Sequence, residues 1–89
     1  MSQFFMKDPN AVLDYQVNWA AWLGTDTISA SSWTVPTGLT KDSDTKTTTI
    51  TTIWLSGGTA NTEYHVANKI TTAGGRTEER TFVVRVENL

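Results

Sequence analysis

Polar and apolar residues alternate along several short runs of this chain, and this period of two constrains the fold more than any other feature. In Leu13–Trp19 (LDYQVNW) the apolar side chains fall on one side and the polar ones on the other, as in a β-strand with one buried face. Glu63–Thr72 and Thr77–Val86 alternate in the same way and flank a turn sequence, Ala73–Arg76, whose two glycines tolerate positive φ. The sequence therefore predicts an antiparallel hairpin over residues 63–86.

Two further segments have strand chemistry with less regular facing. Thr27–Val35 changes phase part-way, and a one-residue β-bulge near Ser31 and Ser32 would account for the change. Thr47–Leu55 is rich in β-branched residues and is therefore expected to be extended, but either of its faces could be the buried one.

The segments between these strands are shorter. Phe4–Met6 is either a short edge strand or an arm that docks elsewhere. Ala20–Leu23 could wind into a helical turn, which Gly24 would end. Lys41–Lys46 is expected to be a polar loop.

Six or seven short strands, a turn about every ten residues and no long helix indicate an all-β fold of the sandwich or small-barrel type. About a fifth of the chain is threonine, which suits a pleated surface with one face in water. A chain of 89 residues makes one domain with a modest core. We expect residues 1–8 to be an N-terminal arm and residues 9–89 to be the domain. Lys46, Lys69 and the threonine rows are expected to protect the sheet edges from pairing with other chains.

The composition excludes several classes of protein. Without cysteine the chain has no disulfide and no thiolate metal site, which favours folding in a reducing cytoplasm. A net charge of −2 and the absence of a basic stripe argue against nucleic acid as a partner. No apolar run approaches the roughly 20 residues of a membrane span, so no membrane partner is expected.

The side chains that could perform chemistry form no catalytic pattern. The single histidine, His65, falls on the polar phase of its strand beside Glu63 and Lys69, so an exposed histidine is expected rather than a base or a metal ligand. Asp42-Ser43-Asp44 lacks the later bidentate acid of a calcium loop, and Glu78-Glu79-Arg80 is expected to pair across strands. We predict no enzyme activity, no catalytic residue, no cofactor and no metal.

Four tryptophans are more than so thin a core holds easily. We expect Trp19 and one of Trp33 or Trp54 to fill the core. Trp22 lies in the short segment just before Gly24 and is expected to reach the surface. An exposed tryptophan marks a protein interface or a platform on which a sugar can stack.

The second half of the chain resembles the end of an immunoglobulin-like or fibronectin-type domain. A strand runs into a Gly/Thr corner, a tyrosine opens the next strand and a glycine-rich hairpin leads to the last one. These features lie in Trp54–Thr59, Tyr64–Val66 and Ile70–Thr77. The resemblance implies an Ig-like antiparallel β-sandwich of six or seven strands. It also implies that Tyr64 takes the tyrosine-corner place, with its hydroxyl bonded back to nearby backbone.

A wider set of motifs resembles a family of small phage and prophage proteins that lie among virion structural genes and are described as fibre–tail adaptor-like. In chain order the motifs are Lys7-Asp8-Pro9, Leu13-Asp14-Tyr15, Trp19, Asp26-Thr27-Ile28, Trp33–Pro36, Trp54–Thr59 and Thr72–Arg76. Residues 1–6 match nothing in that pattern. The resemblance brings no catalytic residues and implies a non-enzymatic structural or adaptor component of a phage or prophage virion.

Such an adaptor is expected to bind other virion proteins of the tail, neck or fibre, and to be oligomeric in the assembly. The residues that we expect to bind them are Phe4, Phe5 and Met6 in the arm, Trp22, and Arg76 at the hairpin tip, where an anionic partner could bind. The expected location is the virion, and the host cytoplasm during assembly. The alternative is a carbohydrate-binding or adhesive Ig-like module that uses an exposed tryptophan, Trp22 or Trp33.

Overall fold

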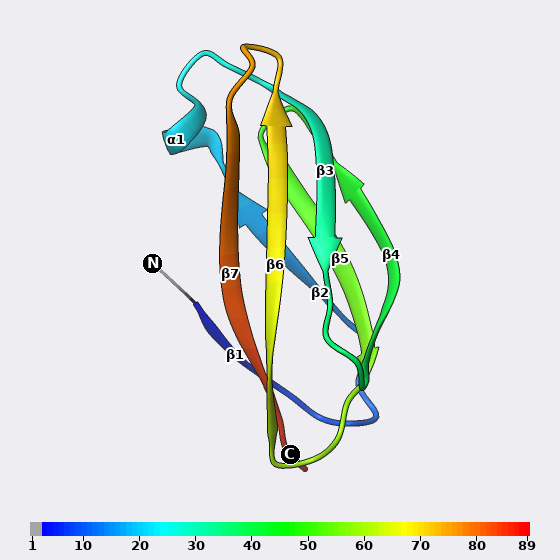
Figure 1. Ribbon diagram of the computed structural model, residues 1–89. Helices are drawn as coiled ribbons and strands as arrows, with labels where there is room; N and C mark the ends of the chain where they lie inside the picture. Colours follow the sequence, from blue (N-terminus) through cyan, green and yellow to red (C-terminus); the bar gives the residue numbers. More distant parts are fainter. Residues whose placement is uncertain (1–2) are drawn as a thin grey trace.

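The computed structural model describes residues 3–89, which form two packed β-sheets and one helical turn (Figure 1). The elements are β1 (Phe4–Lys7), β2 (Leu13–Asn18), α1 (Ala20–Leu23), β3 (Ile28–Thr34), β4 (Leu39–Lys46), β5 (Ile50–Gly57), β6 (Thr62–Thr72) and β7 (Thr77–Val86). The molecule is elongated along the strands, with extents of 42 × 23 × 18 Å. No helix within the described part of the chain is long and apolar enough to cross a membrane.

The four-stranded sheet has the order β1-β7-β6-β3 and the three-stranded sheet has the order β2-β5-β4. If β2 to β7 are equated with strands B to G, the sheets contain the B-E-D and C-F-G neighbours of an immunoglobulin-type sandwich. The prediction of an all-β sandwich is confirmed, with seven strands. One pairing differs from the antiparallel expectation, because β1 enters beside β7 and runs parallel to it.

The hairpin predicted over residues 63–86 is confirmed as β6 and β7, which pair from Thr62 opposite Val86 to Thr71 opposite Thr77. One face of each strand enters the core between the sheets. The buried apolar residues are Tyr15, Val17, Trp19, Leu23, Ile28, Leu39, Ile53, Leu55, Tyr64, Val66, Ile70, Phe82, Val84 and Val86.

A buried polar network connects the two sheets inside this core. The Trp19 indole Nε1 donates to Asn68 Oδ1 at 3.0 Å, and the Thr51 hydroxyl donates to the same oxygen at 2.6 Å. Asn68 Nδ2 in turn donates to Ser31 Oγ at 3.0 Å. Because each of these groups would lose its partner if a strand slipped by one residue, the network fixes the register between the sheets.

Some expectations for the middle of the chain need correction. Lys41–Lys46 belongs to edge strand β4 rather than to a loop, with a register shift between Lys41 and Ser43. The bulge in β3 lies between Ile28 and Ala30, earlier than predicted. The facing of β5, left open above, is now defined: Thr51, Ile53 and Leu55 point inward, and Trp54 points outward.

Candidate docking surfaces

The N-terminal segment forms an edge strand, the first of the two alternatives set out above. Strand β1 pairs with β7 from Phe4 opposite Val83 to Lys7 opposite Val86. Its side chains alternate, so that Phe4 and Met6 are exposed whereas Phe5 and Lys7 face inward. The division of the chain at residue 8 into arm and domain stays a prediction.

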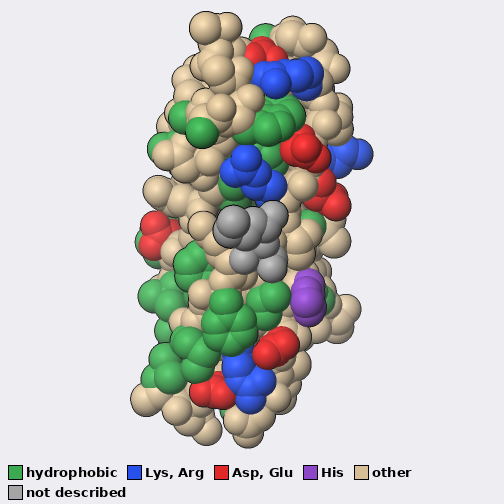
Figure 2. All heavy atoms as spheres, turned by 90° about the vertical axis from the view of Figure 1, so that its left-hand side faces the viewer, with side chains coloured by type: hydrophobic (Ala, Val, Ile, Leu, Met, Phe, Trp, Pro, Cys, Tyr) green, Lys and Arg blue, Asp and Glu red, His purple; other side chains and the backbone are tan. Residues whose placement is uncertain are grey.

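Phe4, Met6 and Val83 lie together on the outer face of the four-stranded sheet, and we call them the β1 patch. Phe4 is 55% exposed and Met6 is 41% exposed. The strand pairing places Val83 beside Phe4, and His65 beside Val83 on the next strand. Figure 2 shows hydrophobic side chains gathered on the lower half of this side of the molecule, with the histidine at their border. The patch is therefore an apolar surface held on a paired strand.

Phe5, which the sequence grouped with Phe4 and Met6, packs into the core instead. Its ring centroid lies 5.0 Å from that of Tyr15 and 5.5 Å from that of Phe82. The ring of Phe82 also packs against that of Trp33, with the two ring centroids 6.0 Å apart. Since aromatic pairs at these distances stabilise a core, Phe5 attaches β1 to both sheets.

Lys7 is fully buried, which the sequence did not indicate. Its ammonium group donates to the Gly57 carbonyl oxygen at 2.7 Å and to the Asp8 carbonyl oxygen at 3.0 Å. Burial lowers the pKa of the Lys7 amine, although the charges of Asp8 and Asp42 partly offset this effect. Because Gly57 ends β5, the Lys7 side chain fastens β1 to the opposite sheet.

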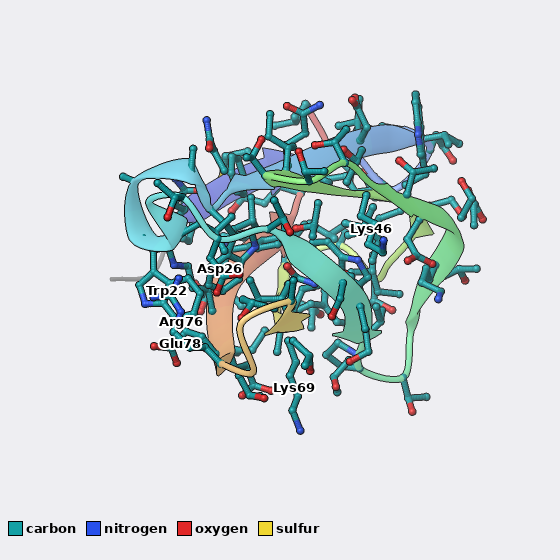
Figure 3. The ribbon with its side chains drawn as sticks, turned by 90° about the horizontal axis from the view of Figure 1, so that it is seen from above. Trp22, Asp26, Lys46, Lys69, Arg76 and Glu78 are labelled. Atoms are coloured by element: carbon teal, nitrogen blue, oxygen red, sulfur yellow. The ribbon has the colours of Figure 1, made fainter. Side chains whose placement is uncertain are left out.

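Trp22 and Arg76, which the sequence proposed separately, lie in contact at the other end of the sandwich. The Arg76 Cζ atom lies 4.3 Å from the centroid of the Trp22 ring, within the range of a cation–π contact. Arg76 also donates to the carbonyl oxygen of Leu23 at 2.9 Å and to Asp26 Oδ2 at 3.2 Å. Figure 3 shows Trp22, Asp26 and Arg76 gathered next to α1, whereas Lys46 and Lys69 lie apart from them.

Asp26 joins the loop that follows α1 to the β6–β7 turn. Its carboxylate accepts hydrogen bonds from the backbone N–H groups of Thr27 at 2.9 Å and Gly74 at 3.0 Å. The Thr72 side chain and these N–H groups, together with Arg76, lower the pKa of Asp26 to about 2. A Cβ atom at Gly74 would lie 2.8 Å from Asp26 Oδ2, so glycine permits this close approach. We call Trp22, Asp26, Gly74 and Arg76 the upper loop cluster.

The aromatic contact continues from Trp22 into the core. The centroids of Trp22 and Trp19 are 5.6 Å apart, with an edge-to-face angle of 70°. The Arg80 Cζ atom lies 4.3 Å from the Trp19 ring centroid, and Arg80 also donates to the Asn18 carbonyl oxygen at 3.3 Å. These contacts therefore connect the β6–β7 hairpin to the segment around α1. We call the contacting residues the Arg–Trp stack; in order they are Arg76, Trp22, Trp19 and Arg80.

The exposed tryptophan is not one of the two expected on a surface patch. Trp22 and Trp33 are both half-buried against the core. Trp54 instead lies on the outer face of the three-stranded sheet and is 40% exposed. Its cross-strand neighbours are Asp14 on β2 and Ser43 on β4. No sequence signal distinguished Trp33 from Trp54, because both faces of β5 carry large apolar residues.

Ionisable groups elsewhere are engaged in local contacts or exposed. His65 is exposed on the outer face, as its strand phase predicted. Asp44 forms an ion pair with Lys41 at 3.0 Å, and Asp42 accepts a hydrogen bond from the Ser56 hydroxyl at 2.9 Å. Within residues 3–89, no group of three His, Cys, Asp or Glu side chains could hold a metal ion.

Comparison of the sequence with models of protein families identifies the family to which the chain belongs. The model described as podophage GP4 fiber-tail adaptor protein gp77, the Gp77 family, matches residues 7–85. The chain belongs to this family. A search of the curated proteins found no match.

Membership of the Gp77 family confirms the resemblance that the sequence motifs indicated. The family is one of phage structural adaptors rather than a class of enzyme, and its members are virion components. An adaptor family also implies interaction with other virion proteins. The matched region covers most of the sandwich, whereas Phe4 and Met6 of the β1 patch lie outside it.

Proposed function

We propose that this chain is a rigid adaptor that joins a tail protein and a fibre protein of a virion, using the β1 patch for one and the upper loop cluster for the other. The observation that carries the proposal is the exposure of Phe4 and Met6 on a strand that Phe5 and Lys7 hold in place. Large apolar side chains on a surface, when grouped, mark protein interfaces. The family description supports an adaptor between two components.

The β1 patch has the composition of an interface centre with a polar rim. Beside Met6 the strand pairing places Arg85, which forms ion pairs with Glu63 and Glu87. The two carboxylates more than balance Arg85 and leave this side of the rim with a net charge of −1, so the apolar patch itself rather than a strong rim charge is the main binding feature. A partner that covers the patch should therefore present an apolar surface.

The upper loop cluster supplies a second surface at the far end of the sandwich. Backbone hydrogen bonds hold the loops together there. The Ile28 N–H donates to the Thr48 carbonyl oxygen and the Ala73 N–H donates to the Thr27 carbonyl oxygen, both at 2.9 Å. The Arg76 side chain is 43% exposed although it is bonded to Asp26. A pre-ordered surface of this kind loses little conformational entropy when it binds.

Paired substitutions test the β1 patch. Because Phe5 is part of the core, deleting residues 1–6 would disturb folding as well as docking, so point changes are preferable. Virions assembled with Phe4→Asp and Met6→Asp together are expected to lack one of the two partners. Gln16→Asp, at an exposed position of β2 on the other sheet, serves as the control and should leave the virion composition unchanged. Quantitative mass spectrometry of purified virions gives the composition.

The second surface is tested by Ala21→Arg, which changes an exposed residue of α1 beside Trp22 and removes no internal contact. This variant is expected to lose the partner that the Phe4→Asp and Met6→Asp variant keeps. Virions that retain both partners with both variants would contradict the proposal. Thermal unfolding of each purified variant must match the native chain, which separates loss of docking from loss of folding.

The exposure of Trp54 favours a second candidate, a carbohydrate-binding or adhesive module. Its cross-strand neighbours supply a carboxylate, Asp14, and a hydroxyl, Ser43, and such groups beside an exposed aromatic ring can hold a sugar ring. Titration with soluble oligosaccharides should then change the tryptophan emission of the native chain and not that of Trp54→Ala. An unchanged emission across neutral, amino and acidic oligosaccharides would exclude this candidate.

A further inference from the structure

Each sheet has two edge strands, and three of the four carry a charged residue. Strand β4 is the most heavily charged, with Lys41, Asp42, Asp44 and Lys46. Strand β2 carries Asp14, and β1 carries the inward-facing Lys7. Charged residues on an edge strand discourage the addition of another strand. Strand β3, at the other edge of the four-stranded sheet, has neither a charged residue nor a proline.

The edge of β3 is regular over most of its length. Its bulge is confined to the stretch between Ile28 and Ala30, where the Ser29 hydroxyl donates to the Thr71 carbonyl. From Ala30 to Thr34 the pairing with β6 is continuous. Since backbone groups alternate between the two sides of a strand, every second residue of this stretch directs its N–H and C=O away from β6. The result is an open edge of roughly 16 Å.

The side chains next to this edge leave room for another strand. Ala30, Ser32 and Thr34 are exposed and small. A shallow hollow of about 270 Å³, lined by Ala30, Ser31, Ser32, Lys69 and Thr71, lies over the paired side of β3, between it and β6, rather than at the open edge. Lys69 lies on β6, an inner strand, and therefore does not guard the edge as the sequence suggested. Lys69 lies opposite Glu79 on β7, and their opposite charges cancel. The surface beside β3 therefore has no net charge that would select a charged peptide.

We propose that β3 of a second copy of this chain adds antiparallel to this edge, so that the two four-stranded sheets join across a twofold axis. In a twofold antiparallel pairing residue i faces residue j of the other copy, and only the residue on the axis faces its own copy. With the axis at Ser32, the middle of the regular stretch, Ser32 faces Ser32 and Ala30 faces Thr34. Of the four edge strands described, β3 is the one without any charged residue. Cross-strand pairs of serine and threonine are favourable. This interface is separate from the β1 patch and from the upper loop cluster.

Sedimentation velocity of the purified chain between about 1 µM and 1 mM tests the proposal. The native chain is expected to convert from monomer to dimer as its concentration rises. Ser32→Lys should raise the dimer dissociation constant at least tenfold, because it places like charges across the axis. Thr45→Lys on β4, which adds the same charge to another exposed edge residue, is the matched control and should dimerise as the native chain does.

Mixing Ser32→Lys with Ser32→Glu should restore a dimer that neither variant forms alone. A native chain that stays monomeric throughout the range overturns the proposal, as does a Ser32→Lys variant that dimerises normally. The Phe4→Asp and Met6→Asp variant should dimerise like the native chain, which keeps this result independent of the proposed docking function. Thermal unfolding of Ser32→Lys checks that it is folded.

Discussion

The hydroxyl oxygen of Tyr64 accepts a hydrogen bond from the backbone N–H of Thr59 at 2.9 Å, which closes the corner between β5 and β6. This contact confirms the tyrosine-corner role that the resemblance to immunoglobulin-like domains implied. The same hydrogen bond lowers the pKa of the Tyr64 hydroxyl. Gly38 approaches the tyrosine closely, since a Cβ atom there would lie 3.0 Å from the hydroxyl oxygen.

Tyr64→Phe should therefore destabilise the fold. The Thr59 N–H would lose its acceptor at a partly buried position, which costs about 1 kcal/mol. In a domain of this size that loss lowers the melting temperature by about 4–8 °C. Calorimetry of the purified variant measures the change, and an unaltered melting temperature would show that the corner contributes nothing to stability.

Tyr15→Phe makes the same chemical change at a site where the opposite result is expected. The Tyr15 hydroxyl is buried and has no hydrogen-bond partner among the described residues. Burial raises the pKa of this hydroxyl, as does the charge of Asp14. Removing an unpaired buried hydroxyl should leave stability unchanged or raise it by up to about 1 kcal/mol. Urea unfolding of both variants side by side checks the contrast, and a loss equal to that of Tyr64→Phe would contradict it.

Asp26 should make stability depend on acid. Its pKa is lowered from 3.8 to about 2 in the fold, so the unfolded chain binds a proton more readily. The stabilisation is fully present above the unfolded pKa and is lost as the pH falls through about 2. The difference in unfolding free energy between the native chain and Asp26→Asn should be constant above about pH 5 and shrink below it. A difference that does not change with pH would rule out this role.

Lys7 should also make stability rise with pH, but in the alkaline range. Burial lowers its pKa below 10.5, so the unfolded chain holds the proton over a range in which the folded chain has released it. Stability should therefore rise with pH between the lowered pKa and 10.5, relative to Lys7→Met, which cannot titrate. Chemical unfolding of both chains at several alkaline pH values gives the difference. If the unfolding free energies of the two chains changed with pH in the same way, the Lys7 amine would have its ordinary pKa and the prediction would be wrong.

Iodide quenching should locate the exposed tryptophan. Trp54 is 40% exposed whereas Trp19 is fully buried, so most of the quenchable emission should come from Trp54. Trp54→Phe should remove that fraction, and Trp22→Phe, the control at a half-buried site, should leave most of it. Equal losses in the two variants would mean that α1 opens in solution.

The sequence predicted best those elements whose signal is local. The β6–β7 hairpin has alternating residues on both sides of a glycine turn, and each strand buries one face, so pattern and structure agree. Strand β4 was missed because all six residues of Lys41–Lys46 are polar or charged. An edge strand with its outer surface in water needs few apolar residues, and its charges resemble those of a loop.

The candidate surfaces depended on contacts that no local pattern contains. Trp22 and Arg76 are 54 residues apart in the chain and meet only because the β6–β7 turn packs beside α1. The inward facing of Phe5 and the burial of Lys7 likewise follow from the pairing of β1 with β7. Three or four residues at an edge do not define a phase by themselves, which is why Phe4–Met6 had two interpretations.

The parallel pairing of β1 with β7 has a mechanical consequence. A tension applied through the chain that enters β1 and the chain that leaves β7 pulls the two strands in opposite directions along their length. Hydrogen bonds such as those from Val83 N–H to the Gln3 carbonyl and from Glu87 N–H to the Lys7 carbonyl would then be sheared together rather than opened one after another. The sandwich is therefore built to resist stretching between its first and last strands.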